Sequence, residues 1–204
     1  GNADQNRCPV GDAASMFGNP CNAATGNKHE DAVDYEGGGN GLIYRRSYNS
    51  LIPTNIGLGH GWTSTYHKRL EKFGATITAI RPNGAGEPFT QTGGVWLSMV
   101  DSLYTLAVVS GGWTLTLPDG AVEFYNSNGQ LQWQDDPVGL RTTFAYGTDG
   151  RLDLVTGPFG HTLEFDYNAD GNLETLTDPS DESITYNYDA DERLTTVTYQ
   201  DLSL

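Results

Sequence analysis

Tyr125-Asn-Ser-Asn-Gly129-Gln-Leu131 is the first of four similar phrases in the last third of the chain. The others are Tyr146-Gly-Thr-Asp-Gly150-Arg-Leu152, Tyr167-Asn-Ala-Asp-Gly171-Asn-Leu173 and Tyr188-Asp-Ala-Asp-Glu192-Arg-Leu194. Each begins 21 residues after the one before it, with no insertion. A repeat of this length is typical of a stacked array in which each unit buries its apolar face against its neighbours. We therefore expect the tyrosine and the leucine of each phrase to form the core of the repeats.

Each repeat has the pattern of a β-hairpin. The stretch Thr162-Leu-Glu-Phe-Asp-Tyr167 alternates apolar and polar residues and is rich in β-branched and aromatic side chains, which favours a strand. Asp170-Gly171 supplies the positive φ of a tight turn, and Leu173 to Leu176 makes the return strand. Prolines that break the ladder and turn the chain into the next hairpin recur with the same period, as Pro137, Pro158 and Pro179.

The residues before the repeats continue in the same kind of structure. Leu42 to Tyr48 and Trp62 to Phe73 read as strands, and shorter strands are expected at 75–80, 95–100, 103–109 and 113–117. We expect little helix and one twisted sheet rather than two independent domains. The predicted fold class is all-β, an antiparallel meander of stacked 21-residue hairpins in one curved sheet. The predicted organisation is an extended N-terminal arm at 1–34, a β-module at 35–116 and the hairpin array at 117–204.

These phrases resemble a known family. Tyr-x-x-Asp-Gly-Arg-Leu, with proline and glycine close behind, resembles the YD repeat of the RHS/teneurin family over roughly 117–204. Upstream, Gly18 to Lys28, Tyr44 to Ser50 and Gly57 to Trp62 resemble the lead-in module that opens the repeat core of bacterial RHS proteins. The resemblance implies a β-sheet spiral that, in this family, forms a hollow shell around a C-terminal cargo, usually a toxin. Four repeats cannot close such a shell alone.

The charge of the chain excludes one class of partner. The formal net charge is −15, and the residues from Gln130 onward hold 15 acidic side chains against three arginines, which gives −12. A surface this acidic repels phosphate backbones, so we expect no nucleic-acid partner. Acidic residues in turns and along strand edges also keep a β-protein soluble. There is no run of about 18 apolar residues, so we expect no membrane span.

Cys8 and Cys21 are the two cysteines of the chain, and both lie in the arm. They have no Cys-x-x-Cys spacing and no cluster of histidines beside them, which argues against a metal site. We interpret them as a disulfide that closes a short loop, with two reduced thiols as the alternative. A disulfide indicates an oxidising compartment, and therefore a secreted or cell-surface protein.

No stretch of the sequence assembles a catalytic, cofactor or metal site, and we predict none. Asp166 to Thr177 begins like a calcium loop, but it ends on threonine where a bidentate glutamate is needed, so we interpret it as a hairpin turn. Asp136-Pro-Val-Gly-Leu140 resembles the sequence at which RHS cores cleave themselves. Because Pro137 keeps the period of the other repeat prolines, we interpret it as a structural turn. The histidines are scattered singly, and no nucleophile and base share a recognisable spacing.

Three functional classes remain. The first is a non-enzymatic structural module of a secreted or surface RHS protein, which assembles through its strand edges with copies of itself, as a fibre, or with the rest of an RHS shell. This class is motivated by the alternating run from Thr195 to Leu204, which carries no polar cap. The second is a shell segment around a toxin cargo. The third is a carbohydrate-binding adhesin, in which tryptophans would stack on sugars instead of filling cross-strand ladders.

Overall fold

The structure of this chain is a computed structural model that describes residues 21–22, 27–100 and 102–200, with only the backbone for residues 21 and 22. Within these residues all regular structure is β-strand, and the strand pairs are antiparallel. The all-β fold class is therefore confirmed. None of the described residues belongs to a helix long and apolar enough to cross a membrane.

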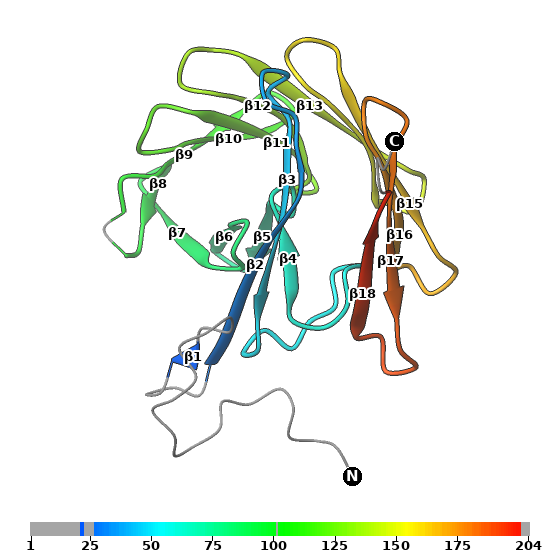
Figure 1. Cartoon of the computed structure of the whole chain (residues 1–204). Helices are drawn as coiled ribbons and strands as arrows, with labels where there is room; N and C mark the ends of the chain where they lie inside the picture. Colours follow the sequence, from blue (N-terminus) through cyan, green and yellow to red (C-terminus); the bar gives the residue numbers. More distant parts are fainter. Residues whose placement is uncertain (1–20, 23–26, 101, 201–204) are drawn as a thin grey trace.

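The four repeats lie in one ten-stranded sheet whose strands follow the order of the chain (Figure 1). This sheet already begins at Thr105, before the first repeat, because the two preceding strands pair with it. Its strands are β9 Thr105–Val109, β10 Gly112–Thr116, β11 Val122–Asn126, β12 Leu131–Asp135, β13 Arg141–Tyr146, β14 Leu152–Thr156, β15 Thr162–Tyr167, β16 Leu173–Thr177, β17 Ser183–Tyr188 and β18 Leu194–Tyr199.

A β-bulge recurs in every repeat and explains the curvature of this sheet. The register shifts immediately before Tyr125, Tyr146, Tyr167 and Tyr188. A bulge bends its strand and increases the local twist, so four bulges at the same repeat position add up to a steady bend. The curved outline of β9 to β18 in Figure 1 follows from this periodic irregularity.

The turns keep their conformation even where the sequence departs from the repeat. Gly171 has φ 84°, and Glu192, at the matching position of the last repeat, has φ 55°. A side chain at positive φ costs about 1–2 kcal/mol, so the fold around this turn overrides the local preference. An Asn or Asp oxygen supports it: Oδ1 of Asn168 accepts the backbone N–H of Asp170 and of Asn172. The calcium-like stretch is therefore a hairpin turn, and no group of metal-binding side chains occurs in the described residues.

The residues before the repeats form two further sheets, so the expectation of one continuous sheet was wrong for this part of the chain. One sheet contains β1 Cys21–Asn22, β2 Asn27–Glu36, β3 Ile43–Asn49 and β4 Trp62–Ser64, and the other contains β5 Arg69–Phe73, β6 Thr76–Ile80, β7 Gly86–Thr92 and β8 Val95–Ser98. The last part of the predicted arm, residues 27 to 34, lies wholly in β2, which is the longest of the described strands.

Two details of the strand prediction also need correction. The strand expected from Trp62 to Phe73 is two strands in different sheets, because the chain turns after Ser64, whose carbonyl accepts the N–H of His67 at 3.0 Å. β7 was not predicted at all. It contains Pro88, which cannot donate a ladder hydrogen bond and is uncommon inside a strand.

The lead-in strands pack on the inner face of the curved sheet. The ring of Tyr44 on β3 lies 5.4 Å from that of Phe165, and the ring of Tyr66 lies 5.4 Å from that of Phe144. The N–H of Leu173 donates to the carbonyl of Gly57 at 2.7 Å. Figure 1 shows β2 and β3 passing across the space that the ten-stranded sheet partly encloses. The two parts therefore share one core.

Candidate functional site

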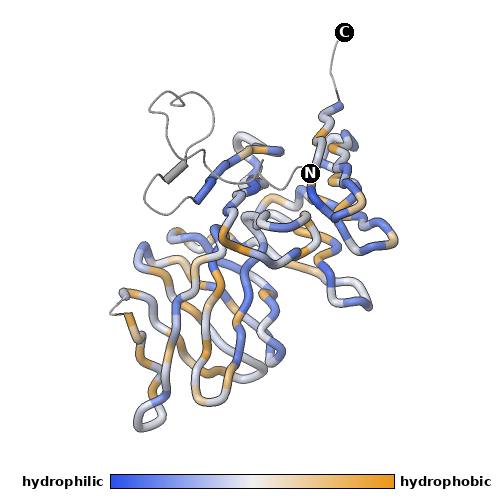
Figure 2. Tube along the Cα trace, turned by 90° about the horizontal axis from the view of Figure 1, so that it is seen from below, coloured by the Kyte–Doolittle hydropathy of each residue, from blue (hydrophilic) through white to orange (hydrophobic). Residues whose placement is uncertain are grey.

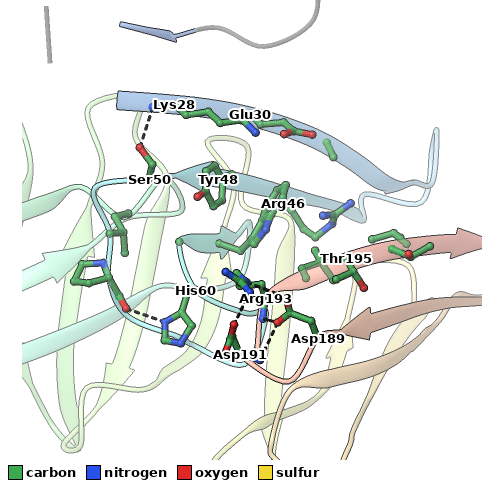
Figure 3. A pocket seen from close by; sticks show the side chains of 18 of the residues that line it. Lys28, Glu30, Arg46, Tyr48, Ser50, His60, Asp189, Asp191, Arg193 and Thr195 are labelled. Atoms are coloured by element: carbon green, nitrogen blue, oxygen red, sulfur yellow. Dashed lines mark hydrogen bonds and ion pairs between the residues drawn. The ribbon is translucent and has the colours of Figure 1, made fainter. Parts of the chain in front are cut away.

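A groove of about 1110 Å³ lies between the last strand of the curved sheet and the sheet of β1 to β4 (Figure 3). Its floor is a face of β2 and β3, to which Glu30 and Ala32 contribute from β2 and Arg46 and Tyr48 from β3. Glu30 pairs with Tyr48 and Ala32 with Arg46 across the two strands, so these alternate residues share one face. The groove is thus built by two parts of the chain that are far apart in sequence.

One wall of the groove is β18, which stands at the edge of its sheet. Among the described residues β18 pairs with β17 alone, so its other edge presents backbone N–H and C=O groups without strand partners. Thr195, Thr196 and Thr198 are exposed along it, while Val197 packs against the core. An edge with this pattern fits the addition of another strand.

One end of the groove is formed by the turn between β17 and β18. The guanidinium of Arg193 bonds the carboxylates of Asp189 and Asp191, with 2.8 Å from Nε to Oδ2 of Asp189. The backbone N–H of Arg193, followed by its guanidinium, holds the pKa of Asp189 below its usual value. The charged side chains of this turn therefore pair with one another.

A buried carboxylate ties the floor of the groove to its wall. Asp34 on β2 is only 8% exposed and accepts Nη2 of Arg46 at 2.9 Å, as well as its Nε. The hydroxyls of Tyr186 and Tyr199 donate to the same carboxylate at 2.8 and 2.7 Å. Burial, with Tyr44 and Asp34 close by, raises the pKa of Tyr186, which keeps its hydroxyl a donor. The two tyrosine hydrogen bonds thus fix β17 and β18 over the lead-in sheet, and the two from Arg46 hold the carboxylate within that sheet.

The same device holds the other end of the curved sheet. Glu123 on β11 is 1% exposed and accepts both terminal nitrogens of Arg81, at 2.7 and 2.8 Å. Lys68 Nζ donates to it at 2.7 Å and the Tyr125 hydroxyl at 2.6 Å. Burial raises the pKa of Glu123, but Arg81 and Lys68 outweigh it and lower the pKa to about 2.

The predicted repeat residues meet as cross-strand partners. Each tyrosine lies opposite the leucine of its own repeat, and the pairs are Tyr125 with Leu131, Tyr146 with Leu152, Tyr167 with Leu173 and Tyr188 with Leu194. All eight residues belong to the core or pack against it. Two of the hydroxyls reach into the preceding repeat: Tyr146 donates to the carbonyl of Leu131 at 2.7 Å, and Tyr188 to that of Leu173 at 2.8 Å.

Other residues singled out from the sequence take structural places. Oδ1 of Asp136 accepts the N–H of Val138 and of Leu140, as in the other turns of the array. The ring of Trp133 is stacked on Phe124 at 5.5 Å and covered by Arg141 at 3.8 Å. Cys8 and the side chain of Cys21 lie outside the described residues, so their disulfide stays a prediction.

Two family models match the two parts of the chain that form the groove. A family model described as RHS Repeat matches residues 167–201, and one described as a domain of unknown function, DUF6531, matches residues 18–89. The chain therefore carries an RHS repeat, preceded by a domain that is found at the N-terminus of RHS/YD-repeat proteins. The RHS repeat supplies β18, the wall of the groove, and the DUF6531 region supplies β2 and β3, its floor. No curated protein matches the chain significantly.

Five charged residues at the two ends of the RHS sheet were not predicted as a group. They are Asp34, Arg46, Lys68, Arg81 and Glu123. One signal was available, because Glu123 is two residues before Tyr125 and therefore shares the inward face of its strand. The partners come from 42 and 55 residues upstream, a distance that no local pattern reveals.

Proposed function

We propose that this RHS chain is a non-enzymatic structural module of a surface or secreted protein, and that its sheet grows by adding the next strand along β18. The observation that carries the proposal is the strand edge of β18 beside a preformed groove. The added strand comes from further RHS repeats of a shell or from a second copy of the chain in a fibre-like assembly. Both use the same edge and the same hydrogen-bonding groups.

The repeat period predicts how that strand would pair. β18 corresponds to β16 after one period, and β16 pairs with β17 through Leu176 and Ile184, with Thr175 opposite Thr185. Val197 takes the place of Leu176 in β18, and Thr196 that of Thr175. The incoming strand therefore places an apolar residue opposite Val197 and a polar one opposite Thr196.

The side chains of the groove support a structural role. Arg46 is held by Asp34, and Arg193 by Asp189 and Asp191. His60 Nδ1 lies 2.9 Å from the carbonyl oxygen of Pro53. These groups are engaged in positioning the backbone, which leaves them unsuited to act as a general base or nucleophile.

The two alternative functions draw different support. A shell segment around a toxin cargo uses the same growing edge, and the curved sheet is compatible with it. A glycan-binding surface has less support, because a sugar stacks on a free aromatic face and the ring of Trp133 is covered by Phe124 and Arg141. Trp62 is likewise flanked by Tyr48 at 5.3 Å and by Arg46 at 4.7 Å.

The proposal is tested by lengthening the array by one repeat. In the extended chain Thr198 is followed by a second copy of residues 178–199, which continues the 21-residue period. The copied segment puts Asp where Tyr199 bonds Asp34, so the extended chain is compared with an extended control. We expect it to have the higher melting temperature of the two, since its new hairpin pairs with β18 and buries its apolar residues in the groove. The matched control carries the same extension with the copied 183–188 strand slipped by one residue, which turns its apolar face outward. Equal melting temperatures for the two extended chains would contradict the proposal.

A further inference from the structure

The sheet of β5 to β8 has a second apolar face that the shared core does not use. Six large side chains on this face and in the segment that follows β8 are between 50% and 87% exposed. They are Phe73, Val95, Leu97, Met99, Val100 and Leu103, and we call them the apolar face. In Figure 2 orange stretches gather at the lower left, on the side where Figure 1 places β7 and β8.

The strand register places three of these side chains, Phe73, Val95 and Leu97, on one face of the sheet. Phe73 pairs with Thr76, Thr76 with Thr90, and Thr90 with Leu97, in a single row across four strands. Val95 is two residues from Leu97 and points to the same side. The opposite face carries Ile77 and Phe89, which are fully buried in the core. The exposed face of this sheet therefore combines large apolar side chains with threonines, and the Arg69–Glu71 ion pair lies on the same side of β5.

The charge distribution singles out the same region. From Pro88 to Leu117 Asp101 is the one charged residue, in a chain whose 37 charged side chains give a net charge of −15. Two copies of the chain repel each other through most of their surfaces. At the apolar face two copies can meet with little repulsion between like charges, and no cationic partner is needed to neutralise the contact.

We propose that the apolar face is the interface of a homodimer in which two copies pack sheet against sheet. Its six exposed side chains offer several hundred Å², on the order of the roughly 800 Å² that each partner contributes to a standard interface. A two-fold axis makes such a contact self-complementary and closes it at two copies. Threonines and aliphatic residues on facing sheets interdigitate as in a β-sandwich. The dimer does not rest on the growth of the array at β18.

The test is the mass of the full chain in solution over a concentration series, measured by light scattering after size exclusion. We expect wild-type protein to reach twice 22.1 kDa. Leu97→Glu and, independently, Phe73→Glu should weaken the dimer at least tenfold, because each places a charge in the interface. Both positions are exposed in the monomer, so the fold is expected to be kept, as circular dichroism can check.

The matched control is Thr143→Glu, an equal change at an exposed position of β13 away from this face. This variant should dimerise like wild type. For the wild-type protein, added salt should strengthen the dimer by screening the net negative charge. Wild-type protein that stays at the mass of one chain up to roughly 1 mM would overturn the proposal. So would a dimer that Leu97→Glu leaves intact. Polymers abolished by Thr198→Lys and unaffected by Leu97→Glu would support growth at β18 and overturn the dimer.

Discussion

The ten-stranded RHS sheet is held by a buried carboxylate near each of its two ends, but its two edge strands have different surroundings. At its start β9 lies beside β8 of the neighbouring sheet, and Glu123 holds Lys68 and Arg81. At its end Asp34 holds Tyr186 and Tyr199, while the edge of β18 stays open beside the groove. The lead-in strands thus hold the sheet near both ends, while among the described residues β9 and β18 are both edge strands without an outer strand partner. What distinguishes the two edges is the groove, which lies beside β18.

Removing the buried carboxylates tests whether both ends are braced. Asp34→Ala leaves the buried charge of Arg46 without its partner, and Glu123→Ala does the same to Lys68 and Arg81. Breaking a buried ion pair from one side costs about 3–5 kcal/mol, and we expect the loss at Glu123 to be the larger of the two. Urea unfolding of both variants measures it, with Asp149→Ala in an exposed ion pair as the control. Losses no larger than that of the control would contradict the brace.

Acid should weaken the start of the sheet in a defined pH range. The pKa of Glu123 is lowered from 4.5 to about 2, so its stabilisation is complete above about pH 4.5 and is lost as the pH falls towards 2. The loss corresponds to about 3 kcal/mol. Glu123→Gln should abolish this part of the pH dependence of the free energy of unfolding. A variant with the same pH profile as wild type would assign the acid sensitivity to other groups.

His67, next to this cluster, adds an earlier step. Burial, with a smaller contribution from Arg69, lowers the pKa of His67 from 6.5 to about 3. The neutral ring therefore favours the fold above pH 6.5, and this contribution is lost as the pH falls towards 3. His67→Gln should remove the part of the decline that precedes the titration of Glu123, and unfolding curves between pH 7 and 5 would show it.

The smallest expected effect is the loss of a single hydrogen bond between neighbouring repeats. The hydroxyls of Tyr146 and Tyr188 bond the preceding repeat, so each tyrosine-to-phenylalanine variant should lose about 1 kcal/mol. Tyr167 occupies the same repeat position, but within the described residues its hydroxyl has no hydrogen-bond partner, which makes Tyr167→Phe a matched control. Equal losses at all three positions would show that the inter-repeat bond is not the cause.

The repeats could be predicted closely because their determinants are local. Asp170-Gly171 defines a turn, and the alternation from Thr162 to Tyr167 defines a strand, without reference to the rest of the chain. The braces are not local, since Asp34 and Tyr186 are 152 residues apart. Whether a charged residue faces the core depends on the strands opposite it, and the sequence alone does not contain that register. The split between Ser64 and Arg69 was missed for a related reason, because neither Gly nor Pro marks that turn.

Amide hydrogen exchange along β18 tests the central claim most directly. The extended chain, with the second copy of residues 178–199 after Thr198, is compared with the parent chain. Growth of the array predicts that amides of β18 that point away from β17 become protected, while those of β9 at the other edge are unchanged. Exchange along β18 that is as fast in the extended chain as in the parent would show that this edge does not accept the next strand.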